Sequence, residues 1–197
     1  SIRRQRQMCI RDRYIQLNTF SPFFMATWNI DPMHSEVQFK VKHLVISTVT
    51  GTFGSFSATM EADEADFSDA KVHFSAEIDS INTNNTQRDG HLKSDDFFNA
   101  AQYPQMTFRS TKLEKAGKEY HLTGDLTIRD KTLPVVLAVK YGGTAVDMYG
   151  QTKAGFEITG KINRKEFGLA WSVVTEAGGL LVSDDIRLSL NIQMAKV

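Results

Sequence analysis

Apolar and polar residues alternate along most of this chain with a period of two, which is the pattern of β-strands that bury one face. Between positions 186 and 194, every second residue is Ile, Leu or Met, and polar side chains separate them. Clear alternation also covers 36–43, 71–79 and 120–129. Weaker alternation covers further segments, namely 26–31, 53–62, 104–113, 133–141 and 154–162. The pattern therefore predicts about eight or nine strands.

Short links between strands that have one polar face predict an antiparallel meander, which hides its apolar face and its edges when it closes into a barrel. A barrel of about eight strands either fills with side chains or holds one small ligand. Small residues on the inward faces are expected to leave room, and they are Gly124, Gly160, Ala58 and Ala76. The predicted fold class is all-β, an extended antiparallel barrel with space for a ligand.

The alternation is interrupted in two places. The segment that follows Thr86, a candidate N-cap, predicts one or two helical turns. The segment 163–179 predicts a loop with a short turn at its start, and it carries Phe167 and Trp171 four positions apart. We expect both segments to lie at the barrel ends, as lids or plugs.

A chain of 197 residues is long enough for one well-buried domain. Residues 1–24 are rich in arginine and show neither strand nor helix period, so we expect a foreign or disordered N-terminal extension before a single domain at 25–197. Met25 is the expected natural start. No continuous apolar stretch follows the basic residues, as a secretory signal would require, so a cytoplasmic location is expected.

The composition excludes several classes of protein. The 23 Lys and Arg residues balance the 23 Asp and Glu residues, so no net field attracts nucleic acid or an anionic membrane surface. Cys9 is the only cysteine, which excludes an internal disulfide and a Cys-rich zinc site. The histidines are scattered without metal-ligand spacing, so no metal site is expected. No apolar run approaches the roughly 20 residues that span a bilayer, so stable membrane insertion is not expected.

Several blocks of the sequence resemble the signature blocks of the YceI-like family of lipid-binding proteins. They are "WNIDPMHSEVQFKVKHLVISTVTGTFGSF", "TNNTQRDGHLKSDDFFNAAQYPQMTFRST", "LTGDLTIRDKTLPVVL", "INRKEFGL" and "SDDIRLSLNIQ". The resemblance runs from Trp28 to Gln193, and "RDGHLKSDDFF" is its most specific part. It implies a bacterial lipocalin-like barrel, often dimeric, that holds a polyprenyl phosphate or an isoprenoid quinone in an internal tunnel. Many members of the family are periplasmic, so the periplasm is the alternative to a cytoplasmic location.

The resemblance gives a binding role to residues that would be plain core in any barrel. For His43, which alternation places on an inward face, a hydrogen-bonded core histidine is favoured over ligand contact. The predicted tunnel lining is Phe39, Val41, His43, Phe53, Phe56, Phe74, Ile78, Leu92, Phe97, Phe98, Phe108, Leu126, Ile158, Phe167 and Trp171.

Asn84, Arg88 and His91 are the candidates for binding the polar head of the ligand. An Arg with a His can hold a phosphate or hydrogen-bond a quinone carbonyl. The alternative is a structural clasp, in which Asp89 caps or pairs locally with Arg88 while His91 bonds a buried carbonyl. The clasp is favoured, because Arg–carboxylate pairs are more common as structure than as sites.

These observations favour a non-enzymatic protein that sequesters or carries an isoprenoid lipid, with no catalytic cofactor. Its expected partners are that lipid and, as the resemblance implies, a second copy in a homodimer. One alternative is an enzyme that acts on a lipid-like substrate with His43, Arg88 and His91 as acid–base groups. Another is a stress-related interaction module whose barrel is filled by its own side chains. A hydrolase triad is disfavoured, because no serine nucleophile elbow or cysteine accompanies Asp89 and His91.

Overall fold

The computed structural model describes residues 25–44, 46–62, 67, 70–172 and 181–197. Strands dominate these residues. In chain order the elements are β1 (Ala26–Ile30), η1 (Pro32–His34), β2 (Glu36–His43), β3 (Ser47–Phe53), β4 (Phe56–Ala62), β5 (Lys71–Glu77), η2 (Ile78–Ser80), β6 (Ile81–Asn82), α1 (Thr86–Lys93), β7 (Gln105–Ala116), β8 (Glu119–Ile128), β9 (Lys131–Val146), β10 (Thr152–Asn163) and β11 (Val182–Lys196). The prediction made for residues 1–24 lies outside the described part of the chain.

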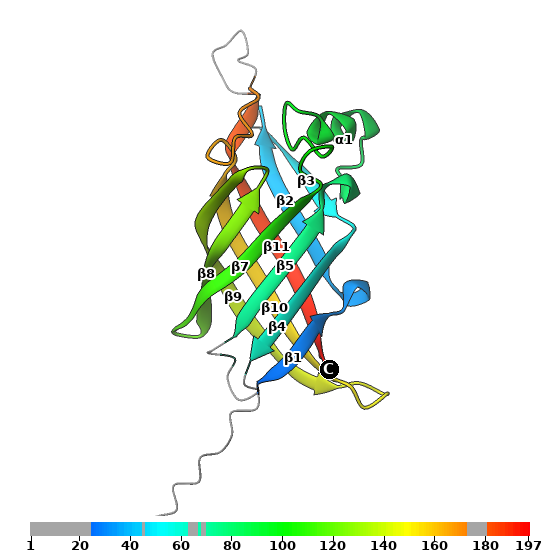
Figure 1. Cartoon of the computed structure of the whole chain (residues 1–197), viewed down its shortest axis with the longest axis vertical. Helices are drawn as coiled ribbons and strands as arrows, with labels where there is room; N and C mark the ends of the chain where they lie inside the picture. The colour runs from blue at the N-terminus through cyan, green and yellow to red at the C-terminus, as the bar shows by residue number, and fades with distance from the viewer. Residues whose placement is uncertain (1–24, 45, 63–66, 68–69, 173–180) are drawn as a thin grey trace, which may run out of the picture.

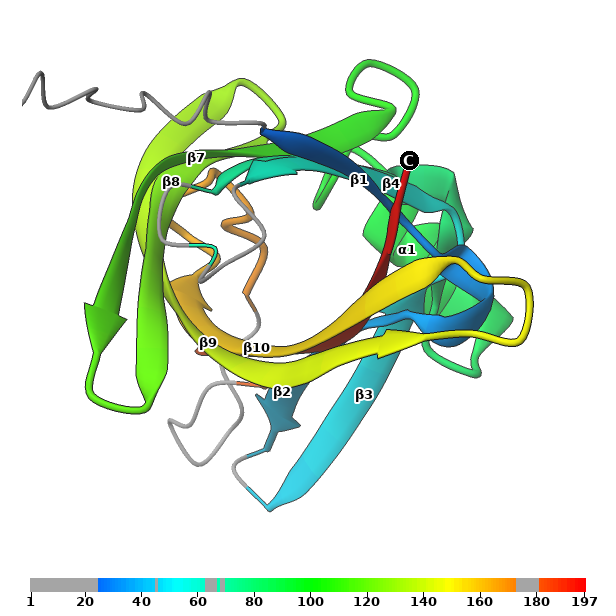
Figure 2. The same cartoon turned by 90° about the horizontal axis from the view of Figure 1, so that it is seen from below.

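Eight antiparallel strands close into a barrel, which Figure 2 shows along its axis. The strands follow one another around the barrel in the order β1, β4, β5, β7, β8, β9, β10 and β11. The ring closes because β11 pairs back with β1, with Lys196 opposite Trp28 and Met194 opposite Ile30. The predicted all-β antiparallel barrel is confirmed.

Strands β2, β3 and β6 extend the wall on the far side of β11. Residues 182–191 of β11 pair with β2, whereas residues 194–196 pair with β1. Strand β3 pairs with β2, and β4 pairs with β1 and β5, so the chain changes partners between Phe53 and Phe56. The sequence pattern predicts one strand over 53–62 and misses most of β3. Four of the seven residues of β3 are Ser or Thr, so its apolar alternation is weak.

The alternation does report which face of each strand is buried. In β8, Leu122, Leu126 and Ile128 are buried, whereas His121 and Asp125 on the opposite face are exposed. The buried faces of the strands meet in one apolar cluster inside the barrel.

The two ends of the barrel are built from different elements (Figure 1). The α1 end holds helix α1, the β8–β9 turn and the turn that follows β10. The hairpin end holds the start of β1, the β9–β10 turn and the C-terminus.

Helix α1 is the predicted helical segment at the barrel end. Its N-cap is Asn85, whose side chain accepts a hydrogen bond from the backbone N of Arg88 at 2.9 Å, so the predicted cap Thr86 is instead the first helical residue. His91 and Lys93 lie in its last turn, where a positively charged side chain interacts favourably with the negative end of the helix dipole. The other predicted segment, in its described part, forms a turn over 164–168 and no helix.

Candidate functional site

A cavity of about 230 Å³ lies inside the barrel. Every strand of the closed ring contributes to its lining, together with β2, β3 and α1. Gln38 and Arg164 are the two lining residues that are not apolar. Such a cavity recognises a ligand by burying apolar surface, with few polar contacts.

Ten of the predicted tunnel residues line this cavity. Period-two alternation places the side chains of the strand residues inward, and the others lie in α1 or in the segment that follows it at the α1 end. They are Phe39, Val41, Phe53, Phe74, Leu92, Phe97, Phe98, Phe108, Leu126 and Ile158. Their contact with a ligand stays a prediction.

The other predicted tunnel residues do not line the cavity, which corrects their predicted position; they are His43, Phe56, Ile78, Phe167 and Trp171. His43 is the last residue of β2, and Phe56 is the first residue of β4. Ile78 and Phe167 are each only 1% exposed, but they pack in η2 and in the turn after β10. Alternation shows which face a residue occupies, and it does not show how far along the barrel axis the residue lies.

Several lining residues escaped the sequence prediction. Phe156 is two residues before Ile158 on the same strand, so the alternation that selects Ile158 could also have found it. Phe67 and Arg164 lie in connections between strands, where no period marks them.

The expected room beside two inward glycines is absent. A side chain at Gly124 would collide with the ring of Phe108, and one at Gly160 would collide with Leu137. These glycines let neighbouring side chains cross the strand, and they create no empty space. Of the two alanines expected to leave room, Ala58 lines the cavity and Ala76 is buried elsewhere.

Arg164 is the charged residue of the lining, and it is 2% exposed. Its Nε donates to the carbonyl of Ser183 at 3.0 Å. Its Nη1 donates to the carbonyls of Leu169 at 2.6 Å and Trp171 at 2.7 Å. The acceptors of Nη2 are the Val182 carbonyl at 3.4 Å and Asp184 Oδ1 at 3.2 Å.

These bonds occupy all five N–H groups of the Arg164 guanidinium. Burial lowers the pKa of Arg164, and the carboxylate of Asp184 opposes that shift. Arg164 therefore joins the turn after β10 to the start of β11, and it has no N–H left for the head group of a ligand.

Arg88 and Asp89 hold the residues before α1 in place. Asp89 Oδ1 accepts hydrogen bonds from the backbone N of Thr83 at 2.9 Å and from its hydroxyl at 2.5 Å. Arg88 Nε donates to the same hydroxyl oxygen at 2.7 Å, and Nη2 donates to the Thr83 carbonyl at 2.6 Å. The contacts form a clasp with buried Thr83 at its centre, where the sequence suggested a direct pair of Arg88 and Asp89. Asn84 beside it is exposed, with a φ of 59°.

His91 lies behind the wall of the cavity. Its ring meets those of Phe97 and Trp171 edge-on, with centroids 5.0 and 4.9 Å apart. Its Nε2 is 3.0 Å from Asp96 Oδ2, so a carboxylate takes the place of the buried carbonyl that the clasp interpretation expected. Phe97 lines the cavity and His91 does not, so His91 supports the lining. The roles of Asn84, Arg88 and His91 toward a head group stay predictions.

Arg129, in the β8–β9 turn, joins two connections at the α1 end. Its Nη1 donates to the carbonyls of Phe97 at 2.9 Å, Asp95 at 3.3 Å and Gly168 at 3.4 Å. Its guanidinium carbon lies 5.8 Å from the centre of the Tyr103 ring. The turn after α1 and the turn after β10 are thus held together by one side chain.

Aromatic contacts close the hairpin end. Phe67 is 4% exposed and lines the cavity. The centroid of its ring lies 5.5 Å from that of Trp28, 5.4 Å from that of Tyr141 and 5.5 Å from that of Phe156. These distances are typical of favourable aromatic pairs.

The described residues hold neither a cluster of metal ligands nor a membrane-spanning helix. No three of their His, Cys, Asp and Glu side chains gather as metal ligands would. None of the helices in the described ranges is long and apolar enough to cross a bilayer.

A closed barrel of eight antiparallel strands around an apolar cavity defines a lipocalin-like architecture. Residues 28–194 match the model of the YceI-like domain family. Protein YceI of Escherichia coli O6:H1 is 43% identical over 146 residues, which are 73% of this chain and 76% of that protein. The chain belongs to the YceI-like family.

Solved structures share the fold. The YceI protein of Campylobacter jejuni is 39% identical, and the match has a TM-score of 0.66 and covers 77% of this chain and 87% of that one. A polyisoprenoid binding domain from Saccharophagus degradans matches with a TM-score of 0.58 and 15% identity, over 88% of this chain and 99% of that one. At this identity the second match shows the fold alone.

Proposed function

We propose that this protein binds a long-chain isoprenoid lipid, either a polyprenyl phosphate or an isoprenoid quinone, inside its barrel and sequesters or carries it without catalysing a reaction. The cavity is the observation that supports this proposal, because its lining is apolar apart from Gln38 and Arg164. The fold shared with a polyisoprenoid binding domain and the family membership favour the same class of ligand.

The affinity of an apolar chain for such a cavity grows with the length that it buries. Each buried methylene contributes about 0.8 kcal/mol. Several isoprene units therefore supply enough free energy for tight binding without any specific polar contact.

The volume of the cavity bears on the length of the chain. An apolar cavity of about 150 Å³ accommodates benzene. The cavity of this barrel, at about 230 Å³, is about one and a half times as large and therefore accommodates roughly two isoprene units. A longer chain must displace side chains at the cavity ends, where Phe98 lies toward α1 and Phe67 toward the β9–β10 hairpin. We expect these rings to repack when a long chain binds.

The polar head of the lipid is proposed to lie at the α1 end, outside the apolar lining. Arg164 has no N–H to offer, since its five donors are already bonded. Asn84, Arg88 and His91 are the polar side chains of this end that remain as head-group candidates.

Native mass spectrometry and solvent extraction of freshly purified protein test the proposal. An apolar molecule of prenyl mass that co-purifies with the protein supports carriage. A monodisperse empty protein that also takes up no added polyprenol or quinone supports the filled-barrel module instead. Turnover of an added lipid supports an enzyme.

A substitution at Phe98 gives the test a matched set of variants. Phe98 lines the cavity, and its ring meets that of Phe53 edge-on with the centroids 6.3 Å apart. Phe98→Asp places a carboxylate against the chain and is expected to abolish lipid retention, whereas Phe98→Leu retains it. Arg88→Ala is expected to weaken retention less. Equal lipid content in the wild type and in folded Phe98→Asp protein would contradict the proposal.

The geometry gives less support to an enzyme. The acid–base candidates His43, Arg88 and His91 do not line the cavity. Arg88 is engaged with Thr83 and His91 with Asp96. A homodimer and a cytoplasmic location stay predictions.

A further inference from the structure

The tip of the β9–β10 hairpin, residues 146–150, exposes large apolar side chains. Met148 is 88% exposed, Tyr149 87% and Val146 65%. In Figure 1 this turn extends past the C-terminus at the hairpin end of the barrel. Exposed apolar side chains that gather at one projecting point mark a contact with another surface.

The hairpin tip is an ordered turn. Asp147 Oδ1 accepts hydrogen bonds from the backbone N of Tyr149 and from that of Gln151, each at 2.9 Å. The Asp147 carbonyl accepts from the N of Gly150 at 3.0 Å, and Gly150 supplies the positive φ of 81° that the turn needs. Because the turn is already fixed, a surface that meets Met148 and Tyr149 gains their burial with little cost in ordering the backbone.

Further apolar side chains are exposed at the same end. Val197, which is 76% exposed, follows β11, and Met25, which is 38% exposed, precedes β1. The backbone N of Val197 donates to the Thr27 carbonyl at 2.9 Å, so these two chain segments lie side by side. The apolar character therefore extends from the tip across the barrel end.

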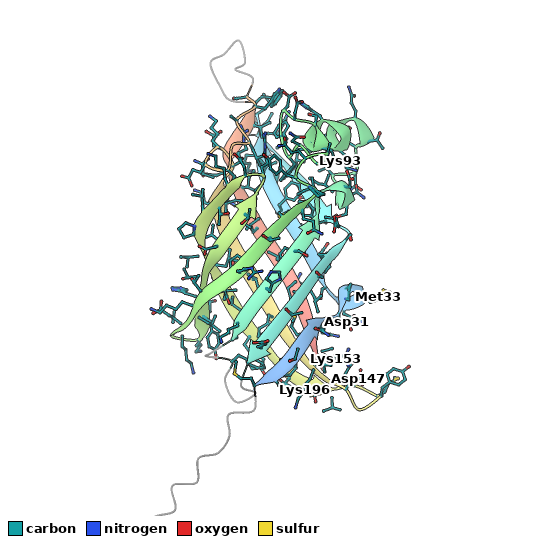
Figure 3. The ribbon with its side chains drawn as sticks, in the orientation of Figure 1. Asp31, Met33, Lys93, Asp147, Lys153 and Lys196 are labelled. Carbon is teal, nitrogen blue, oxygen red and sulfur yellow. The ribbon has the colours of Figure 1, made fainter. Side chains whose placement is uncertain are left out.

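Charges of both signs lie near the hairpin tip among the described residues. Figure 3 labels Asp147, Lys153 and Lys196 at this end, and Asp31 beside Met33 on the side of the barrel above them. Lys153 Nζ lies 3.2 Å from Asp31 Oδ2, and both side chains are largely buried. The described tip residues 146–150 include no Lys or Arg, so the tip itself offers no positive charge that would attract an anionic surface.

We propose that the hairpin tip docks the barrel on the surface of a bilayer of neutral lipid. This inference rests on the proposed function, because the bilayer would be the source or destination of the lipid cargo. A stable protein–protein interface buries about 800 Å² on each partner. A fully buried aromatic side chain contributes about 150–250 Å², so Val146, Met148 and Tyr149 together stay below the area that such an interface buries. A bilayer surface deforms around a convex tip. Tyrosine prefers the boundary between the bilayer and water, where its ring contacts apolar lipid and its hydroxyl contacts water.

A fluorescent label that reports polarity tests the docking directly. Met148→Cys and Met33→Cys are prepared in a Cys9→Ser background, labelled and mixed with phosphatidylcholine vesicles. Met33 is the matched control, because it is 87% exposed but lies on the side of the barrel, away from the tip (Figure 3). A blue shift at position 148 and none at position 33, unchanged by added salt, is the expected result. Equal responses at both positions, or a response at 148 that salt removes, would overturn the proposal.

A pair of serine variants measures the contribution of the hairpin tip. The double variant Met148→Ser and Tyr149→Ser is expected to lower partitioning into phosphatidylcholine vesicles about tenfold, which corresponds to about 1.4 kcal/mol. Met33→Ser is expected to leave partitioning unchanged. Tip-dependent self-association in size-exclusion chromatography, without vesicle binding, would assign the tip to a second copy of the chain and overturn the proposal.

The lipid content of the double variant separates this inference from the proposed function. Unchanged prenyl cargo with lost vesicle binding supports a docking tip that is distinct from the cavity. If the protein binds prenyl cargo but the label at position 148 shows no blue shift with vesicles, the docking inference alone is overturned. If the protein binds vesicles but never holds a prenyl lipid, the proposed function alone is overturned.

Discussion

The two ends of the barrel are closed by different kinds of contact. At the α1 end, buried polar groups such as Arg164 and Thr83 are satisfied by directional hydrogen bonds. At the hairpin end, the ring of Phe67 packs against Trp28 and Phe156. A buried donor that loses its partner is costly, so the first closure tolerates little movement. Aromatic packing is less directional than hydrogen bonding. We therefore infer that side chains at the hairpin end move aside for a ligand more readily than those at the α1 end.

Replacing Arg164 is expected to have the largest effect, because it breaks the polar closure. Arg164→Met leaves the carbonyls of Leu169 and Trp171 and the carboxylate of Asp184 without this donor. We expect the free energy of unfolding to fall by about 3–5 kcal/mol, measured by urea denaturation.

The matched control for Arg164 is another cation, which lies three residues earlier in β10. Lys161 pairs with Asp185 at 2.7 Å, but its side chain is 62% exposed. Lys161→Met is expected to change stability by at most about 1 kcal/mol. Similar losses in the two variants would show that the buried hydrogen bonds of Arg164 do not hold the α1 end.

Replacing Phe67 tests the aromatic closure. Phe67→Ala removes the ring that contacts Trp28, Tyr141 and Phe156, and we expect a loss of about 3 kcal/mol, at the low end for a buried Phe because a barrel end can collapse. Release of a fluorescent prenyl analogue is expected to become faster as well. Phe74→Ala, which alters the cavity wall on β5, should lower stability without speeding release. Faster release in both variants would argue against an exit at the hairpin end.

The barrel wall could be predicted from the sequence, because period-two alternation reports the buried face of each strand. Val41 and Leu126 line the cavity as the pattern indicates. His43 shares the face of Val41 but lies past the lining, since alternation contains no information on depth along the axis. The cavity itself depends on how facing side chains fill space, as Phe108 does over Gly124.

The closures at the ends were harder to predict than the wall. The unusual segment around Arg88 and Asp89 is visible in the sequence, but their partner Thr83 is not, because backbone acceptors are set by the local turn. A lone arginine in a loop is usually solvated. Arg164 is buried because carbonyls from two segments, 169–171 and 182–183, converge on it, and no local pattern reports that convergence.

The smallest expected effect concerns pH and the Asp31–Lys153 pair, close to the hairpin end. Burial acts to raise the pKa of Asp31, but hydrogen bonds and charge from His34 and Lys153 outweigh it, so the pKa lies below its ordinary value of 3.8. The stabilisation is therefore complete above that value and is lost as the pH falls through the lower pKa of the folded state. Asp31→Asn should cost about 1 kcal/mol at neutral pH, and the difference from the wild type should shrink in urea titrations below about pH 4.

Asp79, which faces Lys93 at 3.9 Å and is 80% exposed, provides the control at the α1 end. Asp79→Asn should shift the urea midpoint little at any pH, because an exposed pair is screened by solvent. A gap between the wild type and Asp31→Asn that persists unchanged into acid would mean that the charge of Asp31 does not stabilise the fold. The loss of stability in Asp31→Asn would then come from hydrogen-bond geometry that asparagine fails to reproduce. Ionic contacts of Asp31 would make no contribution to the stability of the barrel near the hairpin end.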